Sequence, residues 1–374
     1  MTATLARGHL LRGVGRAPTL EEHVRVFGQA ARLDVADVER AGLRGRGGAA
    51  FPTAAKLAVV AATSQPVVVA NGAEGEPLSK KDRSLLRVAP HLVLDGALLA
   101  ADVVGAVEVV IAVARPAPEL EAAIGERTLR RTTVRVARVP DRFVAGEETA
   151  LLRALGGGPA KPTTKPPYPF ERGLSGRPTL VQNVETLAHL ALVARGAFGS
   201  TALVTLSGAV ARPGVHEIPL GITLADAVGE LTADPAGYLV GGYFGRFVAP
   251  QEARTLQLTP DVLGAGAIAV LPASTCPVAE VARVVTYLAG ESAGQCGPCT
   301  HGLPALAGAL DPSRRGDHRG EARTFAALVA GRGACRHPDG AARFAESALD
   351  VFADDFARHA KHRGCGRRDE GVLP

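Results

Sequence analysis

The chain has 374 residues, 47% of them hydrophobic, which is enough for two or three domains with cores of their own. Its formal net charge at pH 7 is +5, but only six of the 42 basic residues are Lys, and Arg is dispersed along the chain. Trp is absent and Tyr occurs four times, so the sequence offers no aromatic platform for stacking bases. The composition therefore argues against a nucleic-acid-binding protein.

No apolar run is long enough to cross a membrane, because the most apolar region, residues 92–116, is interrupted by Asp95, Asp102 and Glu108. The first twenty residues contain no apolar segment followed by a small-residue cleavage site, so no secretory signal is predicted. We expect a cytoplasmic protein that does not itself span a membrane, although a partner could hold it at one. Five cysteines in that compartment indicate metal binding, redox chemistry or burial rather than disulfides.

Residues 20–200 alternate short apolar runs (PVVVAN, VEVVIAVA, TTVRVARV) with helical stretches, a pattern typical of α/β architecture. The pattern predicts an α/β domain over residues 1–200. Gly- and Pro-rich loops interrupt it at 42–52, 71–78 and 156–178. Loops of that length usually carry function.

A second region starts near residue 201, where a strand, a turn at 212–214, another strand and a helix opened by Thr223 are predicted. We assign residues 201–275 to a small α+β domain. After Cys276 the apolar residues follow helical spacing, as in Val281, Val284, Val285 and Leu288. Residues 276–374 are therefore expected to form a helical bundle, with a frayed charged tail.

The loop GLRGRGGAAFPTAAK, residues 42–56, combines glycines with a helix start, which suits a phosphate. No strand directly precedes it, so a purely structural turn is the alternative. A second loop, NGAEGEP, follows the strand PVVVAN and is closed by Lys81, Asp82 and Arg83. The carboxyl end of a buried strand is where open α/β sheets bind ligands. Taken singly, its acids and the pair Glu147 and Glu148 are equally explained as solvated loop residues.

Four motifs taken together carry a resemblance: GLRGRGGAAFPT, GEETALL, KPPYP and VQNVETL occur in this order. From about residue 40 to 356 the chain resembles the NADH-binding flavoprotein subunit of respiratory complex I and its relatives in NAD-linked hydrogenases and formate dehydrogenases. The loop NGAEGEP looks closer to the membrane-associated Rnf electron-transport subunit. The resemblance therefore indicates a branch of the superfamily rather than complex I itself.

The resemblance implies a Rossmann-like domain that binds FMN noncovalently, with NADH stacked on the flavin. The positions that fall where the family contacts flavin are Gly45, Arg46, Gly47, Lys56, Asn71, Glu74, Gly146, Glu147 and Asn183. Those that fall where it contacts the dinucleotide are Phe51, Glu76, Glu148, Lys165 and Tyr168. Tyr168 can stack on adenine, and Glu76 can accept from a ribose 2′-hydroxyl while repelling a 2′-phosphate, which predicts NADH over NADPH. The chain departs from the family at Ala50, usually Gly, and at Ala73, usually Asp.

Residues 201–275 resemble the β-grasp domain that the family inserts after the flavin domain, a domain that elsewhere binds soluble ligands. No cluster of aromatic or polar residues here suggests a pocket, so we expect a structural or docking role.

The family pattern S-C-G-x-C-x-x-C with a distant fourth Cys binds a [4Fe-4S] cluster in the helical region. Here Ala293 occupies the first ligand position, and the matching thiols are Cys296, Cys299 and Cys335. Three interpretations remain open: a four-iron or three-iron cluster, a Cys3His zinc site, or buried thiols without metal. The fourth ligand could be Cys365, His301, His337 or solvent. Cys276 is expected to be a small core residue at the far end of its helix.

The predicted activity is that of an NADH dehydrogenase-type oxidoreductase: hydride passes from NADH to FMN, then single electrons reach the cluster and a redox partner. That partner would be ferredoxin-like or a membrane oxidoreductase subunit. No side chain is predicted to act as a general acid or nucleophile. Two alternatives are an Rnf-like electron-transfer flavoprotein without an NADH site and a non-enzymatic scaffold subunit. The electron acceptor and the oligomeric state are left open.

Overall fold

The computed structural model describes residues 10–11, 18–362, 364–369 and 371–374. Its internal contacts divide the chain into two compact units. The first contains the described residues up to Gly75, with Lys80–Leu203 and Val215–Leu220. The second contains Glu76–Ser79, Val204–Gly214 and Gly221–Pro374.

The first unit is built on a sheet of four parallel strands in the order β3-β2-β1-β4. The strands are β1 (Val67–Gly72), β2 (Glu108–Val113), β3 (Thr133–Arg138) and β4 (Thr179–Asn183). Strand β1 thus has β2 on one side and β4 on the other, and Asn71 of β1 is in register with Asn183 of β4. In open parallel sheets, such a reversal of strand order is where ligands bind, outside the carboxyl ends of the strands.

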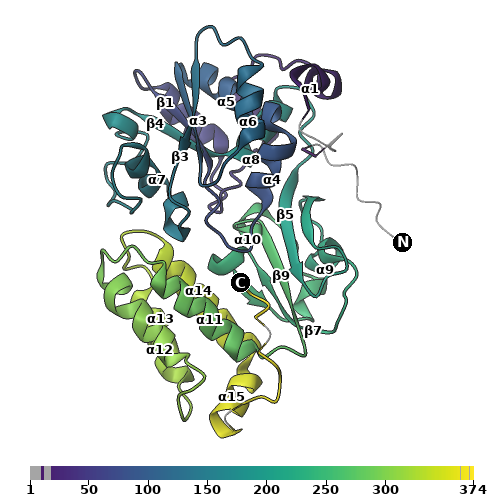
Figure 1. The fold of residues 1–374 in the computed structure, drawn as a ribbon, viewed down its shortest axis with the longest axis vertical. Helices are drawn as coiled ribbons and strands as arrows, with labels where there is room; N and C mark the ends of the chain where they lie inside the picture. Colours follow the sequence, from purple (N-terminus) through teal and green to yellow (C-terminus); the bar gives the residue numbers. More distant parts are fainter. Residues whose placement is uncertain (1–9, 12–17, 363, 370) are drawn as a thin grey trace. The chain divides into compact units, whose positions relative to one another are not determined.

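Helices cover both faces of this sheet, which is why its inner strands are nearly continuous apolar runs. One face packs Val68, Ala70 and Ile111 against the larger core, and the other packs Val69 and Val110 against Leu151 of α7. Figure 1 shows α7 on the opposite side of the sheet from α5 and α8. The helices are α1 (Leu20–Phe27), α2 (Val35–Ala41), α3 (Thr53–Ala61), α4 (Lys81–Val88), α5 (Pro90–Val104), α6 (Pro118–Gly125), α7 (Glu148–Leu155) and α8 (Val184–Val193), with 3-10 turns η1 (Phe143–Gly146) and η2 (Leu174–Gly176). The predicted α/β class is confirmed.

A second sheet has five strands in the order β6-β5-β9-β7-β8. Strands β5 and β9 are parallel, whereas β9 with β7 and β7 with β8 are antiparallel. The elements here are β5 (Thr201–Gly208), β6 (Gly214–Pro219), α9 (Leu224–Val228), β7 (Pro235–Val240), η3 (Gly242–Phe244), β8 (Arg246–Val248), η4 (Glu252–Arg254), α10 (Pro260–Leu263) and β9 (Ala267–Pro272).

The rest of the second unit is helical, and α11, α12, α13 and α14 lie side by side (Figure 1). The helices are α11 (Pro277–Gly290), a π-turn η5 (Pro298–Gly302), α12 (Leu303–Ala309), α13 (Arg319–Val329), α14 (His337–Val351) and α15 (Ala353–His362). Val281, Val284, Val285 and Leu288 of α11 are all buried, as their helical spacing predicts. The predicted division into three domains stays a prediction.

The C-terminal tail differs from its prediction, because its described residues are fastened rather than frayed. The N–H groups of Val372 and Leu373 donate to the buried Glu280 carboxylate at 3.0 and 2.9 Å, and Leu373 is 1% exposed. The sequence conceals this contact because the acid lies on α11, about ninety residues away.

No single helix in the described part of the chain is both long and apolar enough to cross a membrane; only α4 and α5 together, bent by 98°, meet the length and composition required.

Candidate functional site

Two amide side chains mark the carboxyl ends of β1 and β4. The Asn183 Nδ2 donates to the Asn71 carbonyl at 3.3 Å and to Asp82 Oδ2 at 2.6 Å. Asn71 Nδ2 donates to the Gly146 carbonyl at 2.9 Å. Asn183 also caps α8 by accepting from the Glu185 N–H at 3.0 Å. The structure thus brings together three predicted flavin contacts, Asn71, Asn183 and Gly146, at the point where the strand order reverses.

The glycine loop closes beside these amides. The Gly45 N–H donates to the Phe51 carbonyl at 2.9 Å, and α3 starts two residues after the loop returns. A Cβ on Gly47 would lie 3.3 Å from the Asn183 Cβ, so the loop backbone comes within contact distance of the β4 end. Ala50 has φ of 46°, a left-handed conformation that costs about 1–2 kcal/mol for a residue with a Cβ. The loop is therefore shaped for the glycine that the family usually has there.

Arg46 lies inside the unit rather than on the loop surface. Its side chain is 5% exposed, and the guanidinium donates to the carbonyls of Arg44 and Thr201 at 2.8 and 3.0 Å. Its backbone N–H donates to Thr186 Oγ1 at 2.8 Å. These bonds hold the glycine loop on the domain, which makes Arg46 a positioning residue in this structure.

The loop after β1 packs backbone to backbone against the segment that contains η1. A Cβ on Gly75 would lie 2.7 Å from the Arg142 carbonyl oxygen and 2.8 Å from that of Phe143. A Cβ on Gly146 would lie 2.9 Å from the Ala73 carbonyl oxygen. Only glycine permits both approaches. Between them, Glu74 accepts from the Asp82 N–H at 3.0 Å at the start of α4.

We expect Gly75→Ala to lower the free energy of unfolding by about 1–3 kcal/mol, because the added methyl group overlaps backbone atoms that cannot move independently. Urea denaturation followed by circular dichroism measures the change. Gly125→Ala at the end of α6 is the control, since a Cβ there meets no atom within 4 Å. Equal stability of both variants would contradict the close packing of these two loops.

The acids of the third motif and two predicted lysines form one cluster. Lys165 Nζ donates to Glu148 Oε1 at 2.7 Å and Glu147 Oε1 at 3.2 Å, and Lys56 Nζ lies 3.4 Å from Glu148 Oε2. Burial would raise the pKa of Glu148, but the charges of Lys56 and Lys165 outweigh it and lower that pKa. Glu147 Oε2 also caps α7 through the N–H groups of Thr149 and Ala150. The two carboxylates are therefore ionised and balanced by two ammonium groups.

Two predicted dinucleotide contacts present aromatic rings to solvent. Phe51 is 50% exposed and Tyr168 is 43% exposed. The Tyr168 ring stacks on Phe170 with 5.3 Å between centroids and 5° between planes, which holds its orientation. Glu76 belongs to the second compact unit, where its carboxylate accepts from the N–H groups of Tyr243 and Leu78 at 2.8 and 3.2 Å.

Below the two amides lies a buried charge network whose role the sequence does not reveal. The Lys81 ammonium donates to Asp82 Oδ1 at 2.7 Å and pairs with Glu185 Oε2 at 2.8 Å, and the Lys81 side chain is 4% exposed. Asp82 in turn accepts from Asn183. The letters KKD show no sign of burial, since Lys80 beside it is exposed. Spatial contact with Glu185, about a hundred residues away, makes Lys81 the centre of the network.

In the cysteine region, Cys296 Sγ lies 3.6 Å from Cys299 Sγ. Burial raises the pKa of Cys296, but backbone hydrogen bonds, the largest from Ala334, outweigh it and lower that pKa. The bond from Ala334 places the segment of Cys335 beside the first two cysteines. Ala293 is buried at 5% exposure, so the position of the family's first thiol faces the protein interior.

The candidates for a fourth ligand are distributed differently. His301 is exposed, and the buried His337 uses Nε2 to donate to the Leu288 carbonyl at 2.7 Å. Cys365 lies with Cys276 and His359 instead, at the start of α11. Within the described residues, the three thiols and a histidine do not form a compact ligand set, so nothing supports the Cys3His zinc alternative. Three thiols with a buried alanine fit an iron–sulfur cluster that lacks one protein thiolate.

Comparison with known proteins agrees with this geometry. Residues 38–192 match the family model of the Nuo51 FMN-binding domain, and residues 279–359 match that of the NADH-ubiquinone oxidoreductase-F iron-sulfur binding region. The second of the NADH-quinone oxidoreductase F subunits of Rhizobium meliloti (strain 1021) is 31% identical, over 88% of this chain and 89% of the relative. The corresponding F subunit of Mycobacterium bovis is 32% identical, over 88% of this chain and 84% of its own length.

A solved NAD+-reducing [NiFe]-hydrogenase in its H2-reduced state matches with a TM-score of 0.81 and 28% identity, over 91% of this chain. This chain spans 63% of the hydrogenase chain that it matches. The resemblance carried by the four motifs is thus confirmed at both the sequence and the fold level, and the chain belongs to the family of NADH-quinone oxidoreductase F subunits.

Proposed function

We propose that the chain oxidises NADH at a bound FMN and passes the electrons one at a time through an iron–sulfur cluster to a partner redox protein. The observation that carries this proposal is the meeting of Asn71 and Asn183 at the point where the strand order reverses, beside loops that admit no Cβ at Gly75 and Gly146. The matches to FMN-binding and iron–sulfur regions support it.

The residues that would hold FMN are the glycine loop with Gly45 and Gly47 and the two amides at the strand ends. Backbone N–H groups of the loop suit the phosphate, and the amides can both donate to and accept from a flavin ring. FMN supplies the exchange between two-electron hydride chemistry and one-electron transfer. The chain contributes orientation: Arg46 fixes the loop from below, and Glu74 and Glu147 fix the helix starts beside it.

The dinucleotide would lie against Phe51 and Tyr168, whose exposed rings offer apolar faces to a base. Lys165, between Glu147 and Glu148, presents a cation that is already balanced. A carboxylate at Glu76 can accept from a ribose 2′-hydroxyl and repels a 2′-phosphate, so its charge favours NADH over NADPH.

Cys296, Cys299 and Cys335 would bind the cluster, with solvent or a partner in place of the thiol that Ala293 lacks. The segment 201–275 is assigned to a β-grasp domain and the helices after residue 276 to a bundle, both serving to dock redox partners. The protein would act in the cytoplasm or at a membrane-bound partner.

The test is an absorption spectrum of anaerobically purified full-length protein before and after NADH is added. We expect a flavin band that NADH bleaches. Tyr168→Ala should leave the flavin content unchanged and raise KM for NADH about 3- to 10-fold, because a stacking contact contributes about 0.5–1.5 kcal/mol. Tyr168→Phe, which keeps the ring, is the control.

Each other outcome contradicts a defined part of the proposal. A flavin that NADH does not bleach would favour the Rnf-like alternative, and a colourless protein would favour the scaffold alternative.

A further inference from the structure

Three potential metal ligands meet in the second unit, apart from the cysteines assigned to the cluster. The thiols of Cys276 and Cys365 and the imidazole of His359 place their ligand atoms within 4.8 Å of one another. Cys276 Sγ lies 3.2 Å from His359 Nε2. Ligand atoms around a tetrahedral zinc ion are about 3.5–3.8 Å apart, so small side-chain rotations suffice to close this set around an ion.

The backbone brings the two thiols together without help from the sulfur atoms. Cys276 N–H donates to the Arg368 carbonyl at 2.7 Å, and Arg368 N–H donates to the Ser274 carbonyl at 3.0 Å. The side chain of Arg367 reaches Asp355 of α15 at 3.4 Å. The segment after His359 is therefore tied both to the start of α11 and to its own helix. Such prior ordering reduces the entropy that a metal must overcome on binding.

The donor atoms themselves suit zinc. Cys276 is the N-cap of α11, and its sulfur accepts from the Ala279 N–H at 3.4 Å. Burial raises the pKa of this thiol to about 11, whereas the helix start and a bound cation both act in the opposite direction. Two thiolates and a neutral imidazole would bring Zn²⁺ to zero net charge, which limits the desolvation penalty of a partly buried ion.

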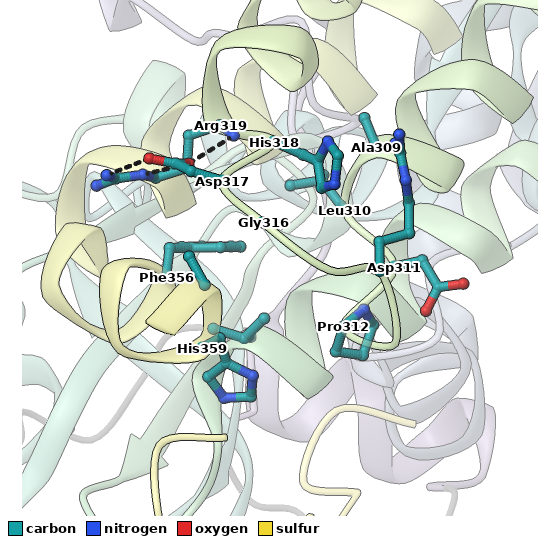
Figure 2. Close-up of a pocket in the computed structure, with 13 residues that line it drawn as sticks. Ala309, Leu310, Asp311, Pro312, Gly316, Asp317, His318, Arg319, Phe356 and His359 are labelled. Atoms are coloured by element: carbon teal, nitrogen blue, oxygen red, sulfur yellow. Dashed lines mark hydrogen bonds and ion pairs between the residues drawn. The ribbon is translucent and has the colours of Figure 1, made fainter. Parts of the chain in front are cut away.

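The imidazole also has an open second contact. His359 Nδ1 is buried and has no hydrogen-bond partner among the described residues. His359 borders a cavity of about 40 Å³, enough for a few water molecules but not for a flavin (Figure 2). Figure 2 shows His359 on the same wall as Phe356, with His318 on another side. A water there would accept from Nδ1 and leave Nε2 free to bind metal, as the outer contacts of zinc-bound histidines do.

This site is separate from the cluster cysteines. Cys276 precedes α11 and Cys296 follows it, and 14 helical residues span about 20 Å. Cys365 therefore serves the start of α11, which also accounts for the fastened tail.

We propose that Cys276, His359 and Cys365 bind one Zn²⁺, with solvent as the fourth ligand, and that this ion fastens the C-terminal segment to the start of α11. Binding releases the two thiol protons to solvent and forms two Zn–S bonds and one Zn–N bond. No electron is transferred.

The test uses the full-length chain in a background that lacks the cluster thiols, Cys296→Ser, Cys299→Ser and Cys335→Ser. We expect this parent to retain about one zinc per chain by elemental analysis. Replacing zinc with Co²⁺ should give tetrahedral bands and a charge-transfer absorption with the intensity of two thiolates. Adding Cys365→Ser or His359→Gln should remove the bound zinc. His362→Gln, an exposed histidine in the last turn of the same helix, is the control and should retain it.

Zinc that survives both ligand variants would overturn the proposal. So would a parent that binds neither Zn²⁺ nor Co²⁺, or a Cys276–Cys365 disulfide in protein prepared with reductant. The cobalt spectrum of the parent decides the matter by itself if either ligand variant fails to fold.

Discussion

Replacing Lys81 with Met is expected to lower the free energy of unfolding by about 3–5 kcal/mol, because it leaves two buried carboxylates without their shared cation. The Asp82 and Glu185 side chains are 8% and 1% exposed, so solvent cannot take over the role of the ammonium group. Urea denaturation followed by circular dichroism measures the change. The start of α4 and the cap of α8 both depend on this network through Asn183, so bound flavin should be lost as well.

The pH dependence of this effect follows from the two carboxylates. Burial raises the pKa of Asp82 to about 6 despite the pull of Lys81. Burial also acts on Glu185, but Lys81 and His189 overcome it and hold that pKa at about 2, below the ordinary 4.5. Stability from Glu185 is therefore present above about pH 4.5 and is lost as the pH falls towards 2. The difference between Lys81→Met and the unaltered protein should shrink over that range.

Lys80→Met is the matched control, since it removes the same side chain from the neighbouring exposed position. It should change stability by less than about 0.5 kcal/mol. The double variant Lys81→Met, Glu185→Gln should recover part of the loss, because it neutralises one of the unpaired acids. A Lys81→Met protein as stable as the control would mean that the network is not a buried ion cluster.

The parts of the site that the sequence predicts are those built from neighbouring residues. The glycine loop, the amide after β1 and the acidic pair before α7 each occupy a short stretch, and strand ends in α/β proteins converge at one edge. For that reason Asn71, Glu74 and Glu147 could be assigned to a site before any coordinate was known. The left-handed Ala50 was likewise indicated by its departure from the family pattern.

Long-range contacts between residues of unremarkable type could not be predicted. Nothing in the letters distinguishes the buried Lys81 from the exposed Lys80, and the partner Glu185 lies in a motif that reads as a helix start. The tail reads as frayed because it is rich in charge and glycine, yet Glu280 collects two of its N–H groups. Cys365 was considered for the cluster, whereas backbone pairing at Arg368 directs it to Cys276. In each case the deciding partner is more than eighty residues away.

The cysteine region yields the second large expected effect, from Ala293→Cys. Ala293 is 5% exposed, and the next residue, Gly294, has φ of 66°, so the chain turns there as a ligand-bearing loop does. A thiol at this position would restore four protein ligands. We expect the iron content to rise from about three to about four per chain, and the EPR signal of an oxidised three-iron cluster to disappear.

Ala309→Cys is a suitable control for this experiment, because Ala309 has the same 5% exposure but lies on α12, and its thiol should leave iron content and EPR unchanged. If the unaltered protein already contains four irons, solvent or a partner occupies the corner, and Ala293→Cys should instead shift the reduction potential by exchanging that ligand for thiolate. If neither iron content nor potential changes, Ala293 does not face the cluster. The buried alanine would then be part of the core, and Cys296, Cys299 and Cys335 alone would determine what the region binds.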